Sequence, residues 1–283
     1  MRYFMSLALI SALFSTTVAV ADNVILMIGD GMGFQHIECV GKNNDLFMNT
    51  IAQKGEITTY SANQKVTDSA AGATAYACGL KTNNSYLGVD RYKKDCQTLA
   101  ESSIANGLNV VIRTTDVITG ATPSAFYAHV DSRYKTDDIL KDLNKASETM
   151  DIKAVQHIDD ETKTVLDNLK QSNKPFFVMI EESETDKQSH LNNYDKMSEA
   201  LVRFDKAIKY AVEFANNRND TTVIVVADHE TGGLTNECTY TIQKHTHANV
   251  PYFVAGHKAD LFTEPVLNNI DIHHKIKEIL FTK

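Results

Sequence analysis

The sequence predicts an α/β fold, a three-layer α/β/α sandwich in which helices cover both faces of a central, mostly parallel sheet. Apolar runs alternate along the chain with amphipathic stretches, which is typical of this class. Several runs are continuous in Val, Ile and Phe, and strands of that kind are buried on both faces, as in parallel sheets. There is no internal repeat and no Pro/Gly-rich linker, so we expect residues 22–283 to form one domain.

Residues 1–21 have the pattern of a secretory signal peptide. Arg2 is the only charged residue before Asp22, Leu7–Phe14 is apolar, and Ala19-Val20-Ala21 is a small-x-small cleavage site. A membrane anchor is the alternative, but the apolar stretch is short and interrupted by serines and threonines. No later stretch is apolar enough to span a bilayer. We therefore expect a periplasmic or secreted protein with no membrane span after cleavage.

The predicted elements follow in order along the remaining chain. Strands are expected at Val24–Gly29, Ile57–Tyr60, Leu108–Arg113, Pro175–Glu181, Thr222–Asp228 and Val250–Ala255. Helices are expected at Ala70–Cys78, Cys96–Asn106, Asp137–Glu148, Glu161–Gln171, Asp195–Asn216 and Asp271–Phe281. The Asp195–Asn216 helix has the clearest pattern, because its apolar residues recur at helical spacing along one face.

Charge and cysteine content restrict the class of protein. The formal net charge is −8 at pH 7, and an acidic chain lacks the basic patches that nucleic-acid binding needs, so no nucleic-acid partner is expected. An even number of cysteines in an exported protein permits disulfides, with three possible pairings. Pairing Cys78 with Cys96 would close the smallest loop, but the sequence leaves the pairing open. The four cysteines are Cys39, Cys78, Cys96 and Cys238.

Charged side chains follow two of the predicted buried strands. Asp30 comes directly after the first strand, and Asp228-His229 follows the run that begins at Thr222. Functional residues of open α/β sheets lie at the carboxyl ends of the strands, so these side chains are expected at one edge. Aspartate and neutral histidine are suitable ligands for divalent metals. The alternative for Asp30 is a simple Asp-Gly turn.

An acidic cluster, Glu181–His190, follows the strand at Phe176–Ile180. Burying these carboxylates is costly unless they bind a metal ion or remain in contact with water. The cluster is therefore either a metal site or a solvated acidic loop. Asp186 and His190 would share one face of a helix, as a pair of ligands does. His245 and His247 precede the run Val250–Phe253, and one of them could be a further ligand. The other histidines considered are expected at the surface or in the core: His36, His129, His157, His257, His273 and His274.

Ser69 precedes a predicted helix of small residues. It is therefore either an N-cap or a nucleophile placed where free backbone N–H groups favour an anion. No histidine lies near it in the sequence, so activation would have to come from a metal. Arg133 is either a surface salt-bridge residue or, beside metals, a bidentate ligand for phosphate.

Taken together, these segments resemble the alkaline phosphatases. The matching motifs occur in the family's order: Asp30-Gly31-Met32-Gly33, Thr67-Asp68-Ser69-Ala70-Ala71, Ala121-Thr122-Pro123, Ala128-His129, Ser132-Arg133, Asp186-Lys187-Gln188-Ser189-His190, Ala227-Asp228-His229 and His245-Thr246. The resemblance implies an alkaline phosphatase-like fold. It also implies hydrolysis of small-molecule phosphate monoesters through a phosphoserine on Ser69, which gives an alcohol and inorganic phosphate.

The resemblance further implies two zinc ions and one magnesium ion. One zinc would be held by Asp186, His190 and His245, and the second by Asp30, Asp228 and His229 with Ser69. Asp30 would also reach the magnesium, together with Thr122 and Glu181. Arg133 would clamp two phosphate oxygens, and Lys187 would contact phosphate through water.

Two departures from the family pattern stand out. Gly120 stands two residues before Thr122, where the family commonly has Asp or His beside the third metal. The third site is therefore expected to bind magnesium more weakly, to contain more water or to prefer another metal. Only residues 230–244 separate His229 from His245, where many relatives carry a crown insertion that contacts a dimer partner. A homodimer is therefore possible but doubtful.

The alternatives to a phosphomonoesterase are two other enzymes and one non-enzymatic protein. A phosphodiesterase of the same fold usually has Thr as its nucleophile, and a sulfatase needs a Cys/Ser-x-Pro-x-Arg signature, which Ser69-Ala70-Ala71-Gly72 lacks. A non-enzymatic metal- or phosphate-binding protein is the third possibility. It is less consistent with a chain that keeps the nucleophile and every implied zinc ligand.

Overall fold

The computed structural model describes residues 22–172 and 174–282; the predicted signal peptide lies outside them. Eight strands form the main sheet: β1 (Asn23–Gly29), β2 (Gln53–Thr58), β3 (Asn109–Thr114), β4 (Asp151–Ala154), β5 (Phe176–Glu182), β6 (Thr221–Val226), β9 (Val250–Gly256) and β10 (Val266–Asn268). Their order is β10-β2-β9-β6-β1-β5-β3-β4. Adjacent strands from β6 to β4 are all parallel, whereas β9 runs antiparallel to both β6 and β2. The strands β1, β5 and β6 are buried throughout, as their continuous apolar runs require.

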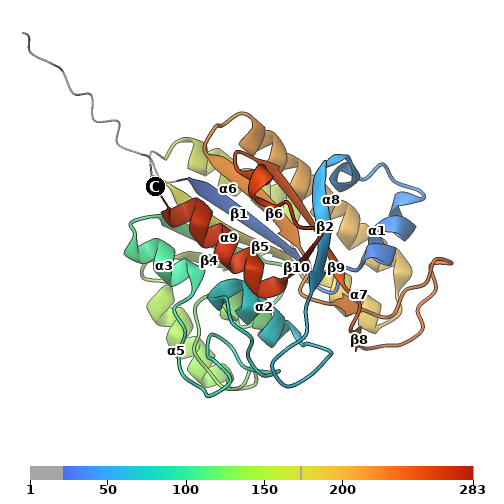
Figure 1. The fold of residues 1–283 in the computed structure, drawn as a ribbon, viewed down its shortest axis with the longest axis horizontal. Helices are drawn as coiled ribbons and strands as arrows, with labels where there is room; N and C mark the ends of the chain where they lie inside the picture. The colour runs from blue at the N-terminus through green and yellow to red at the C-terminus, as the bar shows by residue number, and fades with distance from the viewer. Residues whose placement is uncertain (1–21, 173, 283) are drawn as a thin grey trace, which may run out of the picture.

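Helices cover both faces of this sheet, as Figure 1 shows with α9 in front of the strands. One layer contains α2 (Ser69–Cys78), α3 (Leu99–Ala105) and α9 (Asn269–Phe281), and the other contains α6 (Ile158–Lys170) and α8 (Tyr194–Asn216). The remaining helices are α1 (Phe34–Gly41), α4 (Ala121–Ser124), α5 (Thr136–Ala146), α7 (Glu184–His190) and the 3₁₀ turns η1 (Phe47–Thr50) and η2 (Ala259–Leu261). The predicted three-layer sandwich is confirmed.

The differences from the predicted elements lie mainly at the edges of the sheet. The strands β4 and β10, at its two edges, were not predicted, and each has a single buried residue. The strand predicted at 57–60 is β2, which begins at Gln53 and carries Lys54 and Glu56. Such short or polar strands have little apolar pattern to detect, because they are only partly covered. The helices α1, α4 and α7 are also short and were not predicted.

Two disulfides connect distant parts of the chain. Cys78 pairs with Cys96, the smallest of the possible loops, and Cys39 pairs with Cys238. The second bridge joins α1 to the segment between β7 (Glu230–Thr231) and β8 (His245–Thr246), two short strands that pair antiparallel. It therefore fixes the segment that carries His245 to the body of the fold.

Candidate active site

Four neighbouring strands bring polar side chains to one edge of the sheet. Asp30 follows β1, Asp228 lies just beyond β6, Glu181 lies near the end of β5, and Thr114 ends β3. Because these strands are adjacent and parallel, the side chains meet at their shared carboxyl end. All four residues are buried. The structure thus brings together the charged residues that the sequence places after its buried strands.

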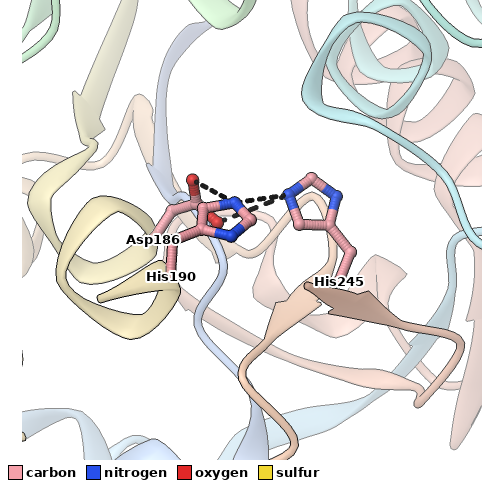
Figure 2. Close-up of side chains that lie close together, drawn as sticks. All are labelled: Asp186, His190 and His245. Atoms are coloured by element: carbon pink, nitrogen blue, oxygen red, sulfur yellow. Dashed lines mark hydrogen bonds and ion pairs between the residues drawn. The ribbon is translucent and has the colours of Figure 1, made fainter. Parts of the chain in front are cut away.

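The first group of potential metal ligands consists of Asp186, His190 and His245. The short helix α7 holds Asp186 and His190 one turn apart, and β8 supplies His245. Figure 2 shows the two imidazole rings and the carboxylate pointing toward one another. The Nε2 atoms of His190 and His245 are 3.1 Å apart, and they lie 3.4 and 3.5 Å from the carboxylate oxygens of Asp186.

Backbone carbonyls orient both rings of this group. His190 Nδ1 lies 2.9 Å from the Gln243 carbonyl, and His245 Nδ1 lies 3.0 Å from the Thr67 carbonyl. A carbonyl can only accept a hydrogen bond, so each Nδ1 carries a proton, and Nε2 is the ring nitrogen that faces Asp186 and could bind a metal. Metal-binding histidines usually donate their other ring N–H to a carbonyl or carboxylate in this way.

The second group is centred on His229. Its Nε2 atom lies 3.1 Å from Ser69 Oγ, 3.3 Å from Asp30 Oδ1 and 3.2 Å from Asp228 Oδ2. Asp30, Asp186 and His229 are close enough for one atom of each to contact a single cation. Asp186 therefore borders both groups. A neutral imidazole nitrogen facing several oxygen atoms is a typical ligand arrangement for a divalent metal.

The charges of this region are strongly perturbed by burial. Burial and then the charges of Asp228, Asp186 and Glu181 raise the pKa of Asp30 well above its ordinary value. Burial raises the pKa of Asp228 to about 7 and that of Glu181 to about 8, and burial lowers the pKa of His229. The carboxylates disfavour one another's ionisation because like charges repel at this distance.

Three oxygen atoms in this region lack a hydrogen-bond partner among the described residues. They are Asp30 Oδ1, Asp228 Oδ2 and Thr122 Oγ1, all buried. A buried oxygen without a partner costs about 1–3 kcal/mol. Cations contacting these oxygens would remove that cost, so the donor set fits divalent metals.

Ser69 is the first residue of α2 and is 4% exposed. The preceding Asp68 is the N-cap, so Ser69 itself does not cap the helix. Asp68 accepts hydrogen bonds from the backbone N–H groups of Ala71 (3.0 Å) and Ser85 (2.9 Å). The same carboxylate lies 3.5 Å from Arg133 Nη1, which places the guanidinium near the N-terminus of α2. Sequence reasoning assigned no role to Asp68.

Lys187 is held by carboxylates rather than being free. Its Nζ lies 2.8 Å from Asp116 Oδ1 and 3.2 Å from Glu184 Oε1. Partial burial lowers the pKa of Lys187, but these two partners raise it more, so the net shift is upward. Asp116 was missed in the sequence, although it comes two residues after the end of β3, much as Asp30 follows β1.

Several of the remaining histidines have partners outside the two groups, His36 and His129 among them. His36 is buried, with Nδ1 accepting from the Gly33 backbone N–H and Nε2 lying 3.1 Å from Ser189 Oγ. His129 Nε2 lies 2.8 Å from Glu101 Oε1, at the start of α3. His36 thus lies in the core, as one of the two expected locations, and His129 is partly buried.

Comparison with known proteins gives a consistent picture. The sequence model of the family described as alkaline phosphatase matches residues 21–161 and 153–251. The chain is 29% identical to alkaline phosphatase 4 of Bacillus subtilis (strain 168), over 75% of this chain and 62% of that protein, so it spans less than two thirds of that relative. The solved alkaline phosphatase of the Antarctic bacterium TAB5 aligns with a TM-score of 0.84 and 26% identity, covering 92% of this chain and 98% of that one. A mutant of the TAB5 enzyme with histidine replaced by aspartate and magnesium bound in its M3 site has a TM-score of 0.83.

Proposed function

Because the chain belongs to the alkaline phosphatase family, we propose that it is a metal-dependent enzyme that hydrolyses phosphate monoesters through a phosphoserine on Ser69. The observation that carries this proposal is the position of the Ser69 hydroxyl. It lies at the N-terminus of α2 and 3.1 Å from His229 Nε2, beside the second group of potential metal ligands, which shares Asp186 with the first group. The products would be an alcohol and inorganic phosphate.

The proposed metals are two zinc ions and one magnesium ion. Asp186, His190 and His245 would hold one zinc; Asp30, Asp228 and His229, with Ser69, would hold the other; Asp30, Thr122 and Glu181 would hold magnesium. The unpartnered oxygens of Asp30, Asp228 and Thr122 support this assignment. The magnesium-bound TAB5 mutant supports the choice of the third metal. When bound, the cations would supply the positive charge that stabilises the serine alkoxide and the charge developing on phosphate.

The chain's own residues would bind and orient the substrate. Ser69 would form a bond from Oγ to phosphorus as the bond to the leaving alcohol breaks, and water would then release phosphate from the serine. The free N–H groups at the start of α2 favour a phosphate there. Asp68 contacts the guanidinium of Arg133, whose planar group would bind two phosphate oxygens. Lys187 would reach phosphate through water from the other side.

We further propose an exported protein with a single catalytic domain over residues 22–283. Two disulfides are typical of an oxidising compartment, which supports a periplasmic or secreted location. Among the described residues, no helix has the length and apolar character needed to cross a membrane. With only residues 230–244 between the last two ligand segments, a dimer built on a crown insertion is not expected.

The test is phosphate release by mature protein, loaded with zinc and magnesium, from an aryl phosphate monoester and its diester analogue. Monoester turnover should be lost in Ser69→Ala. Ser103→Ala is the matched control, since Ser103 is a fully buried helical serine without a partner among the described residues. After acid quenching, peptide mapping should find the phosphate on Ser69.

The other outcomes separate the alternatives. Preference for the diester would make the protein a phosphodiesterase of the same fold. An absence of turnover with two zinc ions bound per chain would favour a binding protein. Turnover that survives in Ser69→Ala would contradict the phosphoserine step.

A further inference from the structure

Asp116 occupies the space beside Gly120. A Cβ built on Gly120 would lie 2.2 Å from Asp116 Oδ2 and 2.8 Å from its Cγ. No carbon atom can approach a carboxylate that closely, so a side chain at residue 120 and the present position of Asp116 exclude each other. The carboxylate therefore fills the volume that any larger residue at 120 would take.

Asp116 contacts two parts of the candidate site, one through its carboxylate and one through its backbone N–H. Its Oδ1 atom lies 2.8 Å from Lys187 Nζ, on α7. The Asp116 backbone N–H donates to Thr114 Oγ1 at 2.8 Å, and Thr114 Oγ1 donates in turn to Glu181 Oε2. Asp116 is thus joined through its carboxylate to Lys187 and, through its backbone N–H and Thr114, to the buried carboxylate of Glu181.

An independent feature indicates a ligand at this point. Thr122 is 1% exposed, and its Oγ1 atom has no hydrogen-bond partner among the described residues. A buried hydroxyl without a hydrogen-bond partner beside the buried carboxylate of Glu181 is an unfavourable arrangement, because burial penalises both the charge and the unpaired oxygen. A hard cation with oxygen ligands, such as magnesium, would satisfy all of these groups.

We propose that Asp116 is a positioning residue of the third-metal site, supplying the carboxylate that Gly120 cannot, and that it holds Lys187 at the edge of that site. The inference rests on the proposed function, which assigns magnesium to Asp30, Thr122 and Glu181. It adds a residue outside the motifs that carry the family resemblance. It also means that Gly120 does not leave the site short of negative charge.

The test is the dissociation constant of magnesium for zinc-loaded protein, measured by titration calorimetry. Asp116→Asn keeps the side-chain shape and removes its charge, and should weaken magnesium binding about 10- to 100-fold, as loss of an outer carboxylate usually does. Glu184→Gln is the matched control: it removes the other carboxylate that contacts Lys187 and should change the constant less than twofold. Circular dichroism would establish that both variants are folded.

A charge-swap variant makes the test sharper. Asp116→Ala combined with Gly120→Asp moves the carboxylate to the neighbouring position, and should recover most of the magnesium affinity that Asp116→Ala alone loses. Magnesium binding to Asp116→Asn within twofold of wild type would overturn the inference while leaving the proposed function intact. If wild type binds no magnesium, the inference also fails, and aryl phosphate turnover on zinc alone would decide the proposed function separately.

Discussion

Replacing Gly31 with alanine should distort the candidate site through Asp186. Gly31 has a φ of +71°, and a Cβ there would lie 2.9 Å from the Cα, Cβ and Oδ1 atoms of Asp186. The left-handed backbone costs an alanine about 1–2 kcal/mol. Overpacking against Asp186 adds about 1–3 kcal/mol. The sum, about 2–5 kcal/mol, corresponds to a fall in melting temperature of roughly 4–20 °C for a chain of this size.

The contact should also weaken zinc binding, because Asp186 borders both groups of ligands. We expect the zinc dissociation constant to increase about 10-fold or more, because changes beside a metal ligand that alter its orientation usually weaken metal binding by at least that factor. Thermal unfolding of metal-free protein would measure the stability change, and competition with a fluorescent chelator would measure zinc affinity.

Gly107→Ala is the matched control for this prediction. Gly107 has a φ of +78°, but a Cβ there would meet no described heavy atom within 4 Å. It should therefore show the backbone cost alone, about 1–2 kcal/mol, with unchanged zinc affinity. Equal destabilisation in the two variants, or a Gly31→Ala protein that binds zinc as wild type does, would refute the reasoning.

Three further perturbations address the substrate clamp, a pH-dependent ion pair and a disulfide. Arg133→Ala should lower kcat/KM for an aryl monoester about 10- to 100-fold, the value of a charge-assisted hydrogen bond, in steady-state assays; an unchanged value would exclude the clamp. Burial lowers the pKa of His129, but its hydrogen bonds to Glu101 and to the Gly88 carbonyl raise it more, to about 9. The protonated histidine therefore contributes fully to the stability of the fold below pH 6.5, and this contribution is lost as pH rises through 9. Urea titrations at several pH values would measure the free energy of unfolding. As pH rises from 6.5 past 9, this free energy should fall by about 1–2 kcal/mol less in His129→Gln than in wild type, after allowance for solvent screening. Parallel pH profiles for the two proteins would contradict this. Changing Cys39 and Cys238 to serine should cost about 5 kcal/mol, against about 3 kcal/mol for the other disulfide, from sequence separations of 199 and 18. Removing the Cys39–Cys238 disulfide should also weaken zinc binding, because that bridge anchors the segment before His245. Equal losses of unfolding free energy for the two disulfides would contradict the loop-length argument.

The central part of the fold could be predicted because burial on two faces leaves a clear sequence pattern. The strands β1, β5 and β6 are continuous apolar runs, and the charges that follow them are conspicuous for that reason. Asp30 and Asp228 were identified in this way, and the structure places both within 3.3 Å of His229 Nε2. The antiparallel direction of β9 left no such signal, since a buried strand has the same pattern in either direction.

The residues that were missed act through contacts between segments far apart in sequence. Asp68 reaches Arg133, 65 residues away, and the Cys39–Cys238 bridge spans 199 residues. Asp68 has no local pattern that differs from that of a surface residue, and the cysteines, although identified, carry no local signal of which one pairs with which. Asp116 is different, because it follows β3 closely and could have been found by the reasoning that identified Asp30.

The balance of charge explains why the proposed chemistry depends on metals. The chain carries a net charge of −8, and its cationic groups near Ser69 are already engaged, Arg133 with Asp68 and Lys187 with Asp116. A phosphate dianion approaching this edge would meet Asp30, Asp228 and Glu181, whose raised pKa values reflect burial and, for Asp30, repulsion from the other two. Cations bound among those carboxylates would reverse the local field while leaving the overall charge negative. The bound metals would then supply the positive charge that attracts phosphate, and the protein would hold the metals and Ser69 at fixed positions.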